Sequence, residues 1–317
     1  MEPEQSDVVT SRSVDEDDDE LRAVEPTETP SITQATCGCA GERAVAEVQP
    51  EAQADPVEDA ANPSYVYALG RIEARFPSPG IEKEFAQVLG RAEAPDLTDE
   101  EMLHRVLSDP DNRYLVRQLC FVLSVQGIET YILRPRDPVD LNALVDAVRP
   151  VSSPMDLDVV IGVRGPVAPP ELCNGLTIPV VTFDKIYSFD SEELIKAVER
   201  PKDIPAKDFE KAAKKVLERF LQIGDNAGAA DEHRVLNYLA VRYEKVYQET
   251  VKAYADGFRL SGVDVYPSRL SGTRKILDVV FSFTSRKSDA TEKSFVRVDA
   301  TEQFLFIRTN WSPYYYR

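Results

Sequence analysis

Hydrophobic and polar positions follow two different periods along the chain, and the changes of period outline its elements. The two-residue alternation of Tyr65–Gly70 predicts a strand, and the breakers of PSPG separate it from an amphipathic helix that begins near Ile81. Thr98, with Glu101 three residues later, has the capping-box pattern of a helix start. The spacing of apolar residues in Asn112–Val125 predicts a third helix.

The middle of the chain contains continuous apolar runs, which are typical of strands buried on both faces. A short helix is expected between the first two runs, at Asp140–Val148. Together these elements predict a small sheet with covering helices, an α/β layer. The runs are Glu129–Leu133, Leu157–Val163 and Ile178–Phe183.

The last third of the chain changes period twice. Lys207–Ile223 and Asp231–Tyr254 have the spacing of long amphipathic helices, and the turn GDNAGAAD between them, with Asp231 as the expected N-cap, predicts an antiparallel helix pair. Alternating runs then predict a β-meander whose apolar face packs on the helix pair. The fold class is therefore α+β. The meander strands are expected at Leu277–Phe283, Phe295–Val298 and Phe304–Arg308.

Charge separates the beginning of the chain from the rest. The 317 residues carry a net charge of −18, and residues 1–60 hold 17 Asp and Glu against three Arg, a net charge of −14 that leaves −4 for the remainder. Such an acidic segment with almost no aromatic residues cannot bury enough apolar surface to offset chain entropy. We therefore predict a disordered acidic tail at 1–62 and two folded parts, 63–200 and 201–317, which can also form one unit.

Composition also limits partners and compartment. The acidic tail should repel nucleic acid and anionic membranes, and no apolar run approaches the ~20 residues of a membrane span. The first residues are acidic where a secretory signal would be basic, so a cytoplasmic protein is expected. Four cysteines, at positions 37, 39, 120 and 173, are too few and too scattered for a disulfide scaffold, and reduced thiols are expected.

Long phrases of the chain resemble a known family. YVYALGRIEARFPSPGIEKEF at the first strand, RQLCFVLSVQGIETYILRPRD, DVVIGVRGPVAPPELCNGL, DEHRVLNYLAVRY and PSRLSGTRKILDVVFSFT resemble the C-terminal domain of the PatG-type subtilisin-like proteases of cyanobactin pathways, which make cyclic ribosomal peptides. The resemblance covers roughly residues 65–317. In that family this domain has no assigned reaction, so the resemblance says little about chemistry.

The resemblance implies an accessory module without its protease domain. Subtilisin-like catalysis needs Ser, His and Asp, and neither His104 nor His233 lies in a phrase that resembles the protease motifs. We expect a non-catalytic protein of ribosomal peptide maturation that binds a precursor peptide or a partner subtilisin-like maturation protease. A zinc-dependent enzyme acting on a peptide and a structural homodimerisation domain are the alternatives.

A metal site is the sharper chemical hypothesis. Cys120, Cys173 and His233 lie in the phrases that carry the resemblance, and with a carboxylate from Glu171 or Glu232 they would suit zinc. None has the close paired spacing of a zinc motif. The structural alternative is that Cys120 is a small buried hydrophobe on the third predicted helix and that His233 is a surface residue in a first helical turn.

Three further residues are candidates for binding a peptide. Arg134 and Arg164 could hold a peptide carboxylate, and Asn237 could line a cleft beside the polar GDNAGAAD turn. The structural alternative pairs the arginines with carboxylates such as Asp137 and Asp158, and assigns Asn237 to helix packing.

The Cys37-Gly-Cys39 segment of the tail has several interpretations. Cys-rich linkers before this domain are familiar from the family, which favours a linker. The surrounding PSITQATCGCAGE also resembles the core and recognition sequence of a cyanobactin precursor, which would make the tail a substrate mimic, and a redox or metal role is the third alternative.

Overall fold

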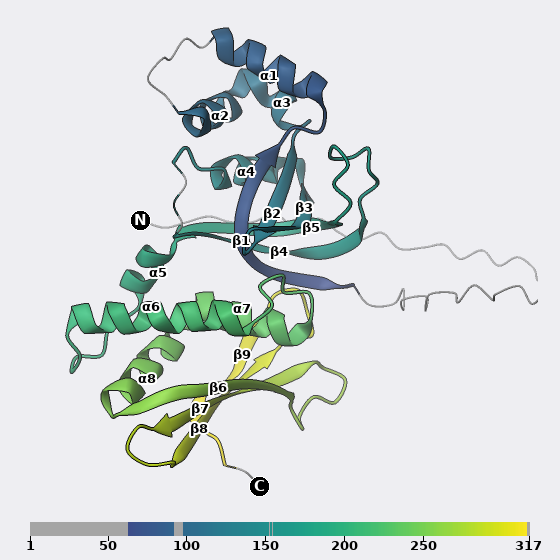
Figure 1. The fold of residues 1–317 in the computed structure, drawn as a ribbon. Helices are drawn as coiled ribbons and strands as arrows, with labels where there is room; N and C mark the ends of the chain where they lie inside the picture. The colour runs from purple at the N-terminus through teal and green to yellow at the C-terminus, as the bar shows by residue number, and fades with distance from the viewer. Residues whose placement is uncertain (1–62, 92–97, 152, 154, 316–317) are drawn as a thin grey trace, which may run out of the picture. The chain divides into compact units, whose positions relative to one another are not determined.

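The computed structural model describes residues 63–91, 98–151, 153 and 155–315 (Figure 1). The predicted acidic tail and the Cys37-Gly-Cys39 segment lie outside these residues. The described residues belong to one compact unit with an α+β fold. None of the helices in the described part of the chain has both the length and the apolarity that a membrane span requires.

The first sheet is a closed barrel in the order β1-β2-β3-β5-β4, in which β3 and β5 are parallel and the other neighbours are antiparallel. Gly162 allows β4 to bend across β5, because a Cβ atom there would lie 2.4 Å from the Thr182 carbonyl oxygen. Of the three predicted apolar runs, Leu157–Val163 is buried almost throughout, whereas the other two, in β3 and β5, include partly exposed residues. The barrel strands are β1 (Tyr65–Arg75), β2 (Cys120–Val125), β3 (Ile128–Pro135), β4 (Asp156–Val167) and β5 (Pro179–Asp190).

Helices close the barrel and contribute to its core. The predicted capping box is confirmed: the Thr98 amide donates to Glu101 Oε2 (2.7 Å) and the Glu101 amide donates to Thr98 Oγ1 (3.3 Å). The core inside the barrel joins side chains of β1–β5 to residues such as Phe85, Leu115 and Leu144 of the helices. These helices are α1 (Pro79–Arg91), α2 (Asp99–Ser108), α3 (Arg113–Val116) and α4 (Leu141–Ala147), with short 3-10 helices at Pro110–Asn112 and Pro138–Asp140. Helix α5 (Ser191–Ala197) does not belong to this group, because its buried Ile195 packs in the second hydrophobic core of the protein.

The predicted helix at 112–125 is wrong in its second half. Helix α3 has only four residues, and Cys120–Val125 forms strand β2, in which all six residues are buried. A strand covered on both faces has no two-residue alternation, so periodicity alone could not distinguish it from a buried helix.

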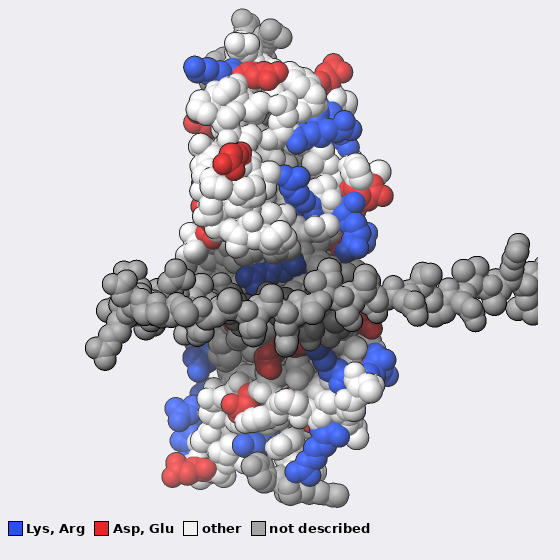
Figure 2. Space-filling model, turned by 90° about the vertical axis from the view of Figure 1, so that its right-hand side faces the viewer, with Lys and Arg blue, Asp and Glu red and all other residues white. Residues whose placement is uncertain are grey.

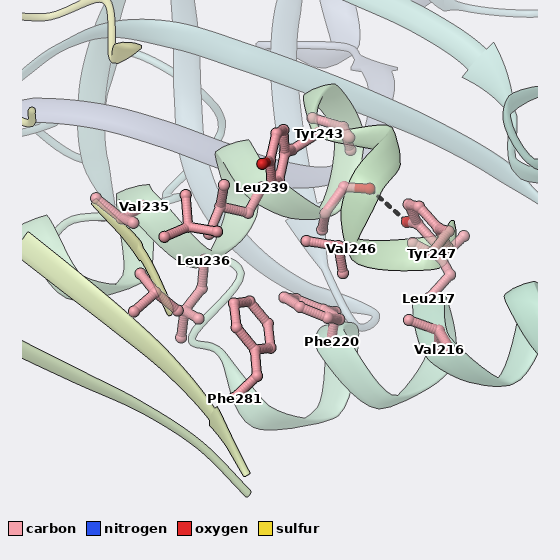
Figure 3. Close-up of a cluster of buried hydrophobic side chains, with 14 of the residues drawn as sticks. Val216, Leu217, Phe220, Val235, Leu236, Leu239, Tyr243, Val246, Tyr247 and Phe281 are labelled. Carbon is pink, nitrogen blue, oxygen red and sulfur yellow. Dashed lines mark hydrogen bonds between the residues drawn. The ribbon is translucent and has the colours of Figure 1, made fainter. Parts of the chain in front are cut away.

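The second core lies among α6, α7 and α8 (Figure 3). Outward-facing residues of the barrel, such as Tyr67 and Val159, pack on one part of this cluster, and Phe281 of the second sheet packs on another. The core therefore crosses the boundary predicted near residue 200. The helices are α6 (Ala206–Ile223), α7 (Asp231–Arg242) and α8 (Glu244–Ala255).

The long helix predicted at 231–254 is interrupted at Tyr243, which separates α7 from α8. The buried Tyr243 hydroxyl accepts a hydrogen bond from the Trp311 amide (2.8 Å) in the second sheet. The expected N-cap is also shifted by one residue. Ala230 occupies the cap position, and the Asp231 carboxylate instead binds Arg234 and Lys275.

The C-terminal strands form the predicted β-meander, packed on the helices through Val279, Phe281 and Phe283. One strand, β6, precedes those that the sequence predicted. The sheet has the order β6 (Phe258–Pro267), β7 (Ile276–Ser285), β8 (Thr291–Asp299) and β9 (Phe306–Pro313).

The loop between α6 and α7 completes one side of β1. The β1 residues 65–70 pair with β4, whereas β2 pairs only with residues 71–75. On the vacant side the Tyr67 amide donates to the Gly228 carbonyl (3.1 Å) and the Leu69 amide to the Asn226 carbonyl (2.8 Å). Gly228 has φ +59°, and a Cβ atom there would lie 2.0 Å from the Tyr67 carbonyl oxygen. This position therefore requires glycine.

Candidate functional site

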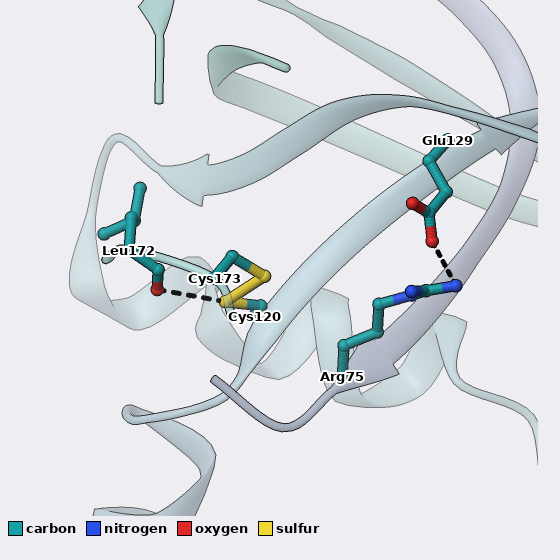
Figure 4. The surroundings of a disulfide bond; sticks show 5 residues. All are labelled: Arg75, Cys120, Glu129, Leu172 and Cys173. Atoms are coloured by element: carbon teal, nitrogen blue, oxygen red, sulfur yellow. Dashed lines mark hydrogen bonds and ion pairs between the residues drawn. A yellow bond between two sulfur atoms is a disulfide. The ribbon is translucent and has the colours of Figure 1, made fainter. Parts of the chain in front are cut away.

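The candidate site lies on the outer face of β2 and β3. Cys120, Val122 and Ile132 point away from the barrel interior and form a small apolar cluster with residues of the β4–β5 connection, 168–178. Cys120 forms a disulfide with Cys173 of this connection, with a Cα–Cα distance of 5.9 Å (Figure 4). The disulfide attaches the connection to the barrel wall.

A cavity of about 650 Å³ opens beside the disulfide. We name it the Arg134 cavity. Its described lining residues come from α3, β2, β3, α4 and the 168–178 connection: Val116, Arg117, Gln118, Leu119, Cys120, Phe121, Ile132, Leu133, Arg134, Pro135, Arg136, Pro138, Leu141, Leu144 and Leu172. Most of these residues are apolar, and the charged ones are arginines.

The three arginines of this cavity differ in their partners. Arg136 Nε lies 2.6 Å from Asp184 Oδ1, so this guanidinium is already bound. Arg117 and Arg134 are exposed and have no ion-pair partner among the described residues. Figure 2 shows Lys and Arg side chains along one side of the barrel part of the molecule. The cavity thus combines an apolar wall with two guanidinium groups that can bind an anion.

A second cavity of about 590 Å³ lies on the other side of the 168–178 connection. We name it the Glu129 cavity. It is lined by Glu73, Glu82 and Glu129, by Arg75, which forms an ion pair with Glu129, and by Cys173 and its neighbours (Figure 4). The connection that carries the disulfide is therefore the wall between two cavities of opposite charge.

The structure brings together two of the three predicted zinc ligands. Cys120 and Cys173 meet as a disulfide and not as free thiols, which corrects the expectation of reduced thiols. Cys120 lies on a strand and not on the predicted helix. His233 lies on α7, where its Nδ1 accepts a hydrogen bond from the Asp225 amide (3.0 Å). Within the described ranges, no group of three or more His, Cys, Asp or Glu side chains is arranged to hold a metal.

The three predicted peptide-binding residues lie in different surroundings. Arg134 lines the Arg134 cavity. Arg164 is exposed and lies close enough to Tyr131 to oppose, by its positive charge, the rise that burial causes in the pKa of this phenol. Asn237 is buried, and its Nδ2 donates to the Tyr67 carbonyl (2.8 Å) and the Asn226 carbonyl (3.3 Å). Its amide already supports the loop that completes β1.

Sequence reasoning missed Arg117 and Leu172 as residues of the site. Arg117 precedes β2, in a segment that was predicted to be helical, and nothing in its own neighbourhood distinguishes it from a solvated surface charge. A usable signal was the presence of Arg117, Cys120 and Arg134 within one of the phrases that carry the resemblance.

Comparisons with known proteins agree with this fold. Residues 65–247 match the family described as PatG Domain, and residues 203–314 match the family described as PatG C-terminal. A solved structure described as "PatG Domain of Unknown Function" has 19% sequence identity and a TM-score of 0.65, over 80% of this chain and 99% of that chain. Comparison with curated proteins gave no match. The chain belongs to the PatG Domain family, and its C-terminal part matches the family described as PatG C-terminal.

Proposed function

We propose that this protein is a non-catalytic binding module of ribosomal peptide maturation, and that it holds a segment of a precursor peptide in the Arg134 cavity. The observation that carries the proposal is a pair of guanidinium groups, Arg117 and Arg134, that have no ion-pair partner in the described part of the chain and line a cavity together with apolar side chains. The maturation context comes from the family name alone.

The size and chemistry of the cavity suit a short peptide segment. A volume of about 650 Å³ falls within the usual range of small-ligand sites, about 300–1,000 Å³. Leu119, Ile132 and Leu172 offer contacts to apolar side chains. Arginine binds carboxylates with a planar, bidentate fork. The expected ligand is therefore an apolar segment that carries a carboxylate, either at its C-terminus or on a side chain.

The lining residues favour binding over catalysis. Those that the structure describes include no His, Ser, Asp or Glu, the side chains most used for proton transfer and nucleophilic attack, and the one cysteine among them is in a disulfide. His104 contacts Ser108 Oγ (3.4 Å) on the exposed surface of α2, and neither residue lines this cavity.

The test is fluorescence anisotropy with an amino-terminally labelled apolar octapeptide that has a free C-terminal carboxylate. We expect Arg117→Gln and Arg134→Gln each to raise the Kd about three- to tenfold, equivalent to about 0.7–1.4 kcal/mol for a partly solvated charge contact. The same peptide with a C-terminal amide should bind more weakly by a similar factor.

Arg269→Gln is the matched control. Arg269 is exposed in the turn between β6 and β7 and lines neither the Arg134 cavity nor the Glu129 cavity. It should leave the Kd unchanged. Equal affinities for carboxylate and amide, or wild-type affinities for both cavity variants, would contradict the proposal. Binding of a purified subtilisin-like maturation protease in place of the peptide would favour the other expected partner.

A further inference from the structure

The 168–178 connection is held to the barrel at few points. Its base is closed by the Ala168 amide, which donates to the Ile178 carbonyl (2.9 Å), and its other backbone hydrogen bonds, such as that from the Gly175 amide to the Pro170 carbonyl (2.7 Å), are internal. Residues 169–177 donate no backbone hydrogen bond to, and accept none from, described residues outside the connection. Beyond its base, the connection is held by the disulfide and by apolar packing.

The apolar packing is modest. Ala168 and Cys173 are buried against Val122 and Ile132, whereas Leu172 and Leu176 are only partly buried there. Because burial of apolar area sets the strength of such contacts, two half-covered leucines hold a loop of this length weakly. The Cys120–Cys173 bond is therefore the main restraint on the wall between the two cavities.

We propose that Cys120 and Cys173 form a reversible redox switch that controls the order of this wall and, through it, the affinity of the Arg134 cavity. The regulatory part rests on the peptide-binding function proposed above. In the disulfide form Leu172 is fixed as part of the cavity lining. In the dithiol form the connection moves away from β2 and the lining is lost.

The chemistry needs an external dithiol reductant. One of its thiolates attacks a sulfur of the pair, which breaks the Cys120–Cys173 bond and forms a mixed disulfide, and its second thiolate then displaces the protein sulfur. Two electrons and two protons end on Cys120 and Cys173, and the reductant becomes a disulfide.

The structure offers a reductant an approach to the disulfide. Cys120 lines one cavity and Cys173 the other, so the pair borders open space on both sides, although each residue is less than a tenth exposed. The Leu172 carbonyl oxygen lies 3.4 Å from Cys120 Sγ (Figure 4). This contact belongs to the disulfide form and is lost when the connection moves away from β2 on reduction.

The test uses the full chain with Cys37→Ser and Cys39→Ser, so that Cys120 and Cys173 are its only cysteines. Thiol titration should give no thiol in the oxidised protein and two after treatment with dithiothreitol, with an unchanged circular dichroism spectrum. Hydrogen exchange of the 168–178 amides should become about tenfold faster on reduction, while exchange in β7 stays the same. The Kd of the carboxylate octapeptide should rise about three- to tenfold, because binding must then order the wall.

A Cys120→Ala/Cys173→Ala variant should behave like the reduced protein under both conditions. A disulfide that is reduced only on global unfolding, or a connection whose exchange is the same in both forms, would overturn the switch. Faster exchange of the connection with an unchanged Kd would overturn its control of binding. If the octapeptide binds neither form, the proposed function fails, and the exchange data still decide whether the pair controls the wall.

Discussion

Two arginines of the barrel wall and two of the C-terminal part are used in opposite ways. Arg117 and Arg134 are exposed at a cavity and have no ion-pair partner in the described ranges. Arg234 and Arg297, by contrast, are turned toward carboxylates and carbonyls of the protein itself. Guanidinium groups that are bound within the fold stabilise it, whereas those left at a surface cavity contribute little to folding and are available for a ligand.

Arg234 is the clearest example of an arginine that is bound within the fold. It is 1% exposed, and its guanidinium donates to Asp231 Oδ1 (2.7 Å) and to the carbonyls of Ala300 (3.2 Å), Glu302 (2.6 Å) and Gln303 (3.1 Å). Burial lowers the pKa of this group and the Asp231 carboxylate opposes that shift. One side chain thus fastens the β8–β9 connection to α7.

Substitution of Arg234 should give the largest loss of stability and is the strongest test of this contrast. We expect Arg234→Met to lower the free energy of unfolding by about 3–5 kcal/mol, because it leaves three carbonyl oxygens without a donor in a buried site. Urea denaturation monitored by circular dichroism measures this change. The matched substitution Arg117→Met should change the free energy by less than about 0.5 kcal/mol. Similar losses for the two variants would refute the contrast.

Asn237 tests whether a predicted binding residue is a structural one. Asn237→Ala removes the donor for the Tyr67 and Asn226 carbonyls, and we expect a loss of about 1–3 kcal/mol in the free energy of unfolding. The Kd of the carboxylate octapeptide should stay unchanged at a temperature where the variant is folded. A higher Kd with an unchanged free energy of unfolding would show that Asn237 contributes to peptide binding and not to the fold.

The ion pairs of Asp299 should make the stability of the C-terminal part depend on pH. Burial alone would raise its pKa, but hydrogen bonds from Thr301, Arg274 and Arg308 outweigh burial and hold the pKa at about 2. A carboxyl group with a lowered pKa stabilises the fold above its unfolded pKa of about 4 and loses that contribution as pH falls through 2.

We therefore expect wild type to lose about 1–2 kcal/mol more than Asp299→Asn between pH 5 and pH 2, the value being reduced because Arg274 and Arg308 are partly solvated. Free energies of unfolding from urea titrations at both pH values give the difference. Parallel pH profiles for the two proteins would show that Asp299 contributes no such term.

Arg134 should give the smallest effect on stability. Arg134→Gln removes no side-chain hydrogen bond or ion pair to a described residue, so the free energy of unfolding should stay within about 0.5 kcal/mol of wild type. The same variant is the one expected to weaken peptide binding. A clear loss of stability would mean that this guanidinium has a structural partner, and the barrel wall would then no longer differ from the C-terminal part.

The parts of the fold that sequence predicts best are those set by local chemistry. The Thr98 and Glu101 capping box depends on residues three apart, and the strand around Phe281 keeps a clear alternation because one of its faces packs on the helices. Strand β2 was missed because both of its faces are buried, one in the barrel interior and the other under the 168–178 connection. Both contacts involve segments far apart in the sequence, which local periodicity does not record.

The candidate site was harder to predict than the fold. Cys120 and Cys173 are 53 residues apart, and nothing between them specifies that their side chains meet. Arg134 was identified from its charge alone, whereas Asn237 was assigned to a cleft although its amide is bound to backbone carbonyls. Whether a polar side chain has a partner within the protein depends on tertiary contacts, and a single sequence does not contain that information.

The loop at Asn226–Gly228 also bears on how the protein can be divided. Without it, the first half of β1 would present unpaired amides and carbonyls along an open strand edge, the kind of edge to which other chains add in aggregation. A fragment that ends near residue 200 would expose this edge together with the apolar side chains of Tyr67 and Leu69. We expect such a fragment to be insoluble, so the segment after residue 200 acts as an intramolecular shield against self-association.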